Sequence, residues 1–170
     1  MTVSEADWDA VFQKELPRIY NYFLYRLNDK AAAEDLTSTS FVRAWKSRDS
    51  YRQDMGAFST WLFTIAHRVA VDYFRKHQPK VISLDEELFG ENNPETIYQE
   101  KADKIILGNA IAALPEREQE IISLKYGAEL SNKEIAELLK LSESNVSTIL
   151  HRTVKQLRGI MMQQGELSHE

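Results

Sequence analysis

The chain has 170 residues, of which 43% are hydrophobic, so we expect one ordinary folded domain or two small ones. Cysteine is absent, which excludes disulfides and thiolate metal sites, and the four histidines lack metal-ligand spacing. We therefore expect no metal and no cofactor. No apolar run approaches the roughly 20 residues that span a bilayer, and the acidic N-terminus is unlike a signal peptide, so we expect a cytoplasmic protein.

The net charge of −5 hides an uneven distribution of charges. Basic residues predominate from Val42 to Lys76, whereas acidic residues predominate from His77 to Glu100. The acidic stretch also contains Pro79, Gly90 and Pro94, which break regular structure and predict a flexible acidic linker. The predicted organisation is an N-terminal domain over 1–77, the linker over 78–104, a C-terminal domain over 105–162 and a tail over 163–170.

Apolar residues at three- and four-residue steps predict four helices in the N-terminal domain. Two short helices flank Pro17, which interrupts or restarts the pattern. The third helix covers AAAEDLTSTSFVRAWKS, and the fourth covers STWLFTIAHRVAVDYFRK. No strand pattern competes with them, so we expect an all-α protein. Large rings mostly lie inside proteins, and Phe23, Phe41 and Trp45 are interpreted as core residues.

The loop between the third and fourth helices mixes ring, hydroxyl and basic side chains around Gly56. Proteins hold unstacked single-stranded bases with such a mixture. Composition alone leaves ordinary packing of the rings equally open. The candidate base-binding residues of this loop are Tyr51, Arg52, Phe58, Ser59, Thr60 and Trp61.

The C-terminal domain carries the pattern of a helix-turn-helix. Ser131 and Glu134 form a capping box, which fixes the start of a short amphipathic helix. Small Ala136 allows a neighbouring helix to approach closely, and about four residues connect to a last helix from about Glu143 to Leu157. These features together favour a helix-turn-helix over two unrelated solvated helices.

The outer face of the last helix is polar throughout. Short hydrogen-bonding side chains come first and longer cations follow, as in a recognition helix whose first turns meet base edges and whose later turns meet phosphates. We therefore predict that this face binds DNA. Its members are Asn145, Ser147, Thr148, His151, Arg152 and Lys155.

Taken in order, these segments resemble a bacterial RNA polymerase sigma factor of the extracytoplasmic function (ECF) group, in the sigma-70 family. AAEDLTSTSFVRAW resembles the polymerase-binding helix of that family, and SYRQDMGAFSTWLFTIAHRVAVDYFRK resembles its promoter-melting segment. ALPEREQEIISLKY and the helix-turn-helix after it resemble its reader of the upstream promoter element. The resemblance covers nearly the whole chain and implies a region 2 helical bundle and a region 4 helix-turn-helix domain.

The resemblance also implies roles for particular residues. The surface that docks on the clamp helices of the largest subunit of core RNA polymerase would include Asp35, Ser38, Thr39, Arg43 and Trp45. His67 and Arg68 would join the loop residues in capturing and flipping bases of the minus-10 element, and Arg75 and Lys76 would touch nearby phosphates. The helix from Ser144 onward would read the minus-35 element.

The function implied is that of an alternative sigma factor, which binds core RNA polymerase, directs promoter-specific initiation and has no enzymatic step or small-molecule substrate of its own. The partners implied are core polymerase, promoter DNA and an anti-sigma factor. A stand-alone helix-turn-helix regulator of the response-regulator output type is the alternative, because its output domain shares LSNKEIAELL. A receiver domain would need alternating strands and helices, which the N-terminal half lacks. A helical enzyme would need converging catalytic groups, and none is found.

Overall fold

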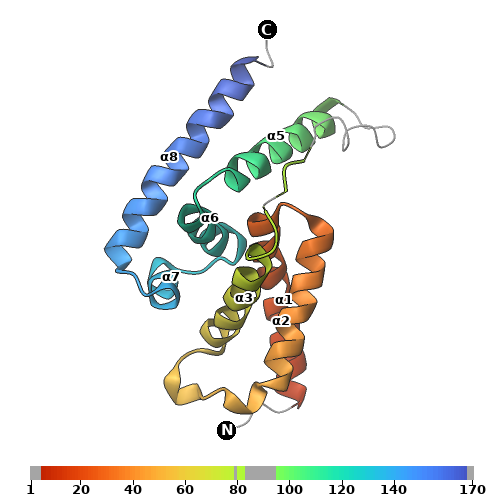
Figure 1. Ribbon diagram of the computed structural model, residues 1–170, viewed down its shortest axis with the longest axis vertical. Helices are drawn as coiled ribbons and strands as arrows, with labels where there is room; N and C mark the ends of the chain where they lie inside the picture. The colour runs from red at the N-terminus through yellow and green to blue at the C-terminus, as the bar shows by residue number, and fades with distance from the viewer. Residues whose placement is uncertain (1–4, 79, 83–94, 168–170) are drawn as a thin grey trace.

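The structure is a computed structural model that describes residues 5–78, 80–82 and 95–167. Every element in these ranges is helical, which confirms the all-α prediction. Figure 1 shows the N-terminal helices packed side by side at one end of the molecule and the C-terminal helices at the other. Most of the predicted linker, residues 83–94, lies outside the described part of the chain.

Helix α1 (Glu5–Leu27) is continuous through Pro17, where two helices were predicted. Proline removes one backbone donor and crowds the carbonyl four residues earlier, that of Gln13. Pro17 and Gln13 are both exposed, so the carbonyl left without a donor lies on the water-facing side of the helix. Water can satisfy this carbonyl, which explains why the helix runs on through the proline.

Helix α2 (Lys30–Lys46) begins immediately after α1, and α3 (Phe58–Phe74) follows two short 3₁₀ turns, η1 (Arg48–Ser50) and η2 (Gln53–Met55). Asp29 caps α2 by accepting a hydrogen bond from the Ala32 amide at 3.3 Å. The three helices enclose aromatic and branched side chains, with small alanines where the helices approach closely. The buried hydrophobic residues of this part are Ile19, Tyr22, Phe23, Leu27, Ala33, Leu36, Phe41, Ala44, Leu62, Phe63, Ala66, Val69 and Ala70.

The C-terminal half begins with α5 (Glu95–Ala112), so the last ten residues of the predicted linker are helical. The reason is that proline and glycine are absent between Glu95 and Lys104, and nothing there prevents helix propagation. Helix α6 (Glu116–Ile122) continues into a π-helical turn, η3 (Ser123–Gly127).

Helices α7 (Asn132–Leu139) and α8 (Glu143–Leu167) form the predicted helix-turn-helix. The capping box of α7 is confirmed, since the Glu134 amide donates to Ser131 Oγ at 3.1 Å and the Ser131 amide donates to Glu134 Oε2 at 2.7 Å. Helix α8 runs ten residues beyond its predicted end at Leu157 and includes the first residues of the predicted tail.

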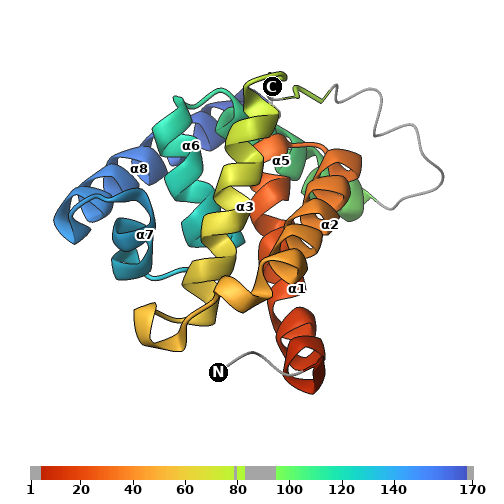
Figure 2. The same cartoon turned by 60° about the horizontal axis from the view of Figure 1, so that its bottom comes forward.

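The two halves pack against each other through one continuous apolar core. Helix α1 contacts α5, α6 and η3, and α3 contacts α7. Figure 2 shows α3 with α1 and α2 on one side and α6 and α7 on the other. Local sequence patterns do not indicate this packing, which brings side chains of the two halves into direct contact.

Candidate nucleic-acid interface

The predicted DNA-binding face of α8 is fully exposed. Its buried side is formed by Val146, Ile149, Leu150 and Leu157, which pack against the rest of the C-terminal half. All seven candidate residues lie on the opposite side and are open to solvent: Ser144, Asn145, Ser147, Thr148, His151, Arg152 and Lys155. This arrangement leaves the first turns of α8 free to enter a DNA groove.

Hydrogen bonds fix the N-terminal end of α8 against its neighbours. The Asn145 amide donates to Ser142 Oγ at 3.0 Å, which caps the helix start. Asn132 of α7 donates from Nδ2 to Ser147 Oγ at 3.0 Å. Arg152 forms an exposed ion pair with Glu118 of α6 at 3.3 Å, a pair that holds the guanidinium only weakly because water competes for both charges. The Arg152 guanidinium is therefore available to a phosphate.

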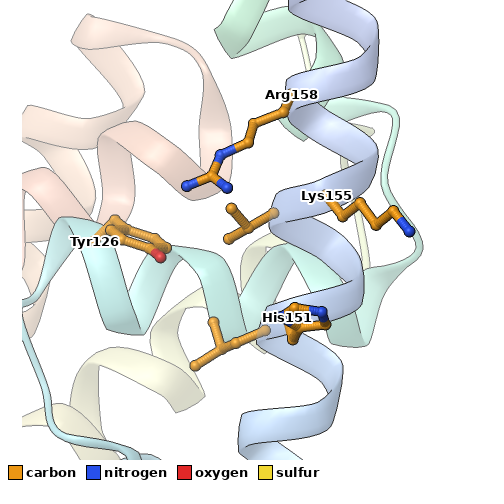
Figure 3. A pocket seen from close by; sticks show the side chains of 6 residues that line it. Tyr126, His151, Lys155 and Arg158 are labelled. Carbon is orange, nitrogen blue, oxygen red and sulfur yellow. The ribbon is translucent and has the colours of Figure 1, made fainter.

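A hollow of about 470 Å³ lies beside this face, between α8 and the end of η3. Figure 3 shows Tyr126 on one wall and Arg158 reaching into the hollow from α8, with Lys155 and His151 on successive turns of the same helix. Arg158 extends the cationic row one turn beyond the predicted face. Arg158 was not among the predicted DNA-binding residues, because the helix was expected to end at Leu157.

Aromatic rings of the predicted base-binding loop pack against one another. The rings of Tyr51, Phe58 and Trp61 lie 5.1–5.4 Å apart, centroid to centroid, in all three pairs. Trp8 of α1 joins them at 5.8 Å from Phe58. Tyr51 also donates its hydroxyl to the Gly56 carbonyl at 3.2 Å. The rings therefore pack together, and all four stay partly exposed. Base binding by this loop stays a prediction.

Some polar side chains of this loop are exposed to solvent, and others form hydrogen bonds within the protein. Arg52 is exposed and paired with Asp54 of the same loop at 3.2 Å. Ser59 is held from α1, since it donates to Glu15 Oε1 at 2.8 Å and accepts from Arg18 at 3.3 Å. Thr60 is half-buried at the start of α3.

The cations predicted on α3 lie mostly in solvent. Arg68, Arg75 and Lys76 are exposed. Arg75 pairs with Asp72 at 3.4 Å, and Asp72 also accepts from Arg43 of α2 at 3.2 Å. This carboxylate therefore joins the cationic end of α3 to the predicted polymerase-docking helix.

The predicted docking residues Asp35, Ser38, Thr39 and Arg43 share one face of α2 because they recur at three- and four-residue steps. Val42 lies in the middle of this face and is 52% exposed. Val42 was not among the predicted docking residues, because a lone valine beside a core residue carries no signal of exposure.

Trp45, the fifth predicted docking residue, supports this region from the side. Its ring lies 5.2 Å from that of Trp8, and the Arg48 guanidinium is stacked 4.0 Å above it. Trp45 is half-buried and is not among the buried core residues, so its interpretation as a core residue was wrong.

His67 lies apart from the other predicted minus-10 residues. Its ring points across to α6, where Nδ1 lies 2.8 Å from Glu120 Oε1. The Tyr22 hydroxyl donates to the same oxygen at 2.7 Å, and Arg26 Nε lies 2.5 Å from Glu120 Oε2 as an ion pair. Arg26 also donates to Gln119 Oε1 at 2.7 Å. A buried polar cluster therefore joins the two halves.

The charge of Glu120 is maintained by its partners. Burial by itself would raise the pKa of this carboxyl, but the hydrogen bond from His67 and the charge of Arg26 outweigh it, so the pKa lies below its ordinary value of 4.5. Burial and the Glu120 charge raise the pKa of Tyr22 well above 10.0. The cluster therefore holds a carboxylate and a neutral phenol at neutral pH.

No helix in the described ranges is long and apolar enough to cross a membrane. The described residues likewise contain no group of three His, Asp or Glu side chains that could hold a metal ion.

Comparison with known proteins identifies the family. The family model of sigma-70 region 2 matches residues 11–80, and that of sigma-70 region 4 matches residues 110–159. The ECF RNA polymerase sigma factor SigM of Bacillus subtilis is 30% identical over 155 residues, which cover 89% of this chain and 93% of SigM. SigW of the same organism is 32% identical over 154 residues, which cover 83% of this chain and 81% of SigW.

Solved structures show the same fold. The sigma factor RpoE of Bartonella quintana, in complex with the anti-sigma factor NepR, superposes with a TM-score of 0.71 at 17% identity over 92% of this chain and 97% of that one. CnrH, in complex with the cytosolic domain of CnrY, superposes with a TM-score of 0.67 at 17% identity over 94% of this chain and 90% of that one.

The fold and the two matched regions define a transcription initiation factor of the sigma-70 type. The chain belongs to the ECF group of this family and is an alternative sigma factor that directs promoter-specific transcription initiation. The response-regulator alternative is not favoured, because region 2 of a sigma factor stands where a receiver domain would be.

Proposed function

We propose that this sigma factor docks on the clamp helices of core RNA polymerase through the exposed face of α2 and reads a two-part promoter with its two halves. The loop over 51–61 and the exposed cations of α3 bind the minus-10 element. The N-terminal half of α8 reads the minus-35 element. Because polymerase and promoter lie in the bacterial cytoplasm, a cytoplasmic location is part of this proposal.

The exposed face of α8 is the observation that carries the proposal. Its uncharged hydrogen-bonding side chains occupy the first two turns, and its cations occupy the next two. Uncharged hydrogen-bonding side chains can contact base edges, and cations can contact phosphates.

An anti-sigma factor is the regulator we propose, because the sigma factor RpoE, which superposes on this chain, was solved in complex with the anti-sigma factor NepR. By covering the docking face of α2 or the DNA-binding face of α8, such a partner would keep this chain from polymerase or promoter.

The test is substitution of two cations on the DNA-binding face. R152A/K155A should weaken promoter binding by the holoenzyme and lower the slope of log affinity against log salt by about one to two, since each lost phosphate contact removes roughly 0.9 from it. The affinity for core polymerase should stay unchanged. The matched control is K101A/K104A, which removes two exposed cations from α5 in the same half.

Each result assigns the helix differently. Loss of promoter binding in R152A/K155A alone supports the DNA-binding face. Equal loss of promoter binding in both double variants would show that the effect comes only from the change in net charge. Loss of polymerase binding in R152A/K155A would place the polymerase, not DNA, on α8.

A further inference from the structure

Glu15 of α1 is a buried carboxylate that reaches the start of α3. It is 2% exposed, and its Oε1 accepts a hydrogen bond from Ser59 Oγ at 2.8 Å. Its Oε2 pairs with Arg18 Nη1 of the same helix at 2.9 Å. Arg18 also donates from Nε to the Ala128 carbonyl at 2.8 Å, which fixes the guanidinium. Glu15 and Ser59 both belong to the N-terminal half, so their contact joins two helices of one domain.

Helix α3 lacks the usual stabilisers of a helix start. Its N-cap residue, Ala57, makes no side-chain hydrogen bond, and its first turn contains no acidic residue. The first amides of a helix have no partner within the helix and carry a partial positive charge, which a capping oxygen or a nearby carboxylate stabilises. Ser59 lies in this first turn. The carboxylate of Glu15, bonded to Ser59, therefore supplies from α1 the negative charge that the sequence of α3 omits.

The first turn of α3 also carries most of the predicted base-binding loop. Its first four residues are Phe58, Ser59, Thr60 and Trp61. The rings of Phe58 and Trp61 contact each other and the ring of Tyr51. Tyr51 lies between η1 and η2, two turns that bury no residue of their own. The position of the three rings therefore depends on how firmly the first turn of α3 is held.

The Ser59 hydroxyl is bonded within its own chain. A hydroxyl has one proton to donate, and that of Ser59 is directed at Glu15. Arg18 Nη1 donates to the same hydroxyl oxygen at 3.3 Å, and the residue is half-buried. Ser59 is therefore placed to connect α1 with α3, although the sequence predicts it as a base contact.

We propose that Glu15 is a positioning residue for the minus-10 element: it holds Ser59 from α1 and thereby fixes the first turn of α3 and the rings that stack on unpaired bases. Rings that are fixed in advance bind bases more tightly, because less conformational freedom is lost on binding. The role in promoter binding rests on the proposed function, whereas the effect of Glu15 on the loop is a property of the free chain.

The effect on the loop can be measured without polymerase or DNA. Glu15→Met removes the carboxylate and keeps a long unbranched side chain. The reporter is hydrogen exchange, followed by NMR, of the Trp61 amide, which donates to the Ala57 carbonyl at 3.2 Å. Exchange should be roughly tenfold faster in E15M, since one hydrogen bond to a charged group typically contributes at least this factor.

The matched control is Asp9→Met, which removes an exposed carboxylate from the same helix and should leave exchange of the Trp61 amide unchanged. Wild-type exchange in E15M would overturn the proposal. Equal acceleration in both variants would also overturn it, because the effect would then come only from the change in net charge.

Promoter binding is tested with a single-stranded oligonucleotide that carries the minus-10 element of a promoter selected from a random library by the wild-type holoenzyme. The E15M holoenzyme should bind this strand roughly tenfold more weakly. Its affinities for core polymerase and for a duplex with only the minus-35 element should stay unchanged. Wild-type affinity for the strand, or equal weakening of all three interactions, would overturn the positioning role.

A double-mutant cycle separates positioning from a direct base contact. Ser59→Ala should weaken binding of the strand about as much as E15M, and the double variant should bind no more weakly than either, because both substitutions break the same hydrogen bond. Additive losses would show that Ser59 contacts DNA independently of Glu15 and would overturn the proposal.

Two further results are decisive. If circular dichroism shows that E15M is unfolded, Ser59→Ala decides alone, since it truncates a small half-buried side chain; wild-type exchange and wild-type affinity in S59A would then refute the proposal. If the wild-type holoenzyme binds no minus-10 strand, the proposed function of the loop fails and the positioning role with it, whereas the exchange rates still show whether Glu15 holds the loop.

Discussion

Gly127 of η3 lies directly against the backbone of Asn21 of α1. A Cβ at Gly127 would be 2.8 Å from the Asn21 carbonyl oxygen and 3.1 Å from the Tyr22 Cα. Both neighbours are backbone atoms of a long helix, so neither can move aside alone. Glycine is required at position 127 because the two backbones approach closely. Its backbone conformation is not the reason, because among the described glycines only Gly56 has a positive φ.

Gly127→Ala is therefore expected to lower the free energy of unfolding by about 1–3 kcal/mol, the usual cost of overpacking. Chemical denaturation followed by circular dichroism measures this. Gly159→Ala is the matched control, because a Cβ there meets nothing within 4 Å; it should raise stability by about 0.5–1 kcal/mol through better helix propensity. Equal effects of the two substitutions would show that the halves are not packed in solution.

Lys140 occupies the left-handed turn between α7 and α8, at φ 56° and ψ 46°. Glycine adopts this conformation without steric cost, whereas a residue with a Cβ is strained by roughly 1–2 kcal/mol. Lys140→Gly should therefore raise the free energy of unfolding by about 0.5–1 kcal/mol, after allowance for the greater entropy of the unfolded chain. Lys140→Ala keeps the strain and should change stability by less than about 0.5 kcal/mol, so a gain in both variants would contradict this explanation.

Features that depend on neighbouring residues were predictable from the sequence. The capping box of α7 needs only Ser131 and Glu134, three residues apart, and the exposed face of α8 follows from helical spacing. These predictions succeeded because the physics is local.

Features that depend on distant partners were not predictable. Glu120 follows Glu116 and Glu118 in a run typical of a solvated helix start, yet it is buried because His67, 53 residues away, and Arg26 meet it. The extension of α8 beyond its predicted end at Leu157 was also missed, and α8 packs against α5, which is distant in the sequence.

Val42 provides a test of the docking face of α2. It is a half-exposed apolar side chain among the polar docking candidates, where a partner surface would bury it. Val42→Asp should weaken binding of core polymerase by roughly tenfold or more, because a carboxylate would be desolvated at the interface, while the melting temperature stays near that of the wild type. Val81→Asp, at a residue that is 73% exposed outside α2, is the control. If both variants bind core polymerase as tightly as the wild type, α2 is not part of the polymerase interface.

The Glu120 cluster also predicts how stability depends on pH. The folded-state pKa of Glu120 is lowered from 4.5, so its contribution is complete above about pH 4.5 and is lost as the pH falls through the folded-state pKa. The free energy of unfolding of the wild type should therefore decrease as the pH falls below about 4.5. Glu120→Gln should lower the free energy of unfolding at pH 7 by on the order of 3 kcal/mol and flatten this acid limb, whereas Glu116→Gln should keep it. Denaturant titrations of the three proteins between pH 3 and pH 7 measure both effects, and an acid limb of equal slope in E120Q would show that other carboxylates produce it.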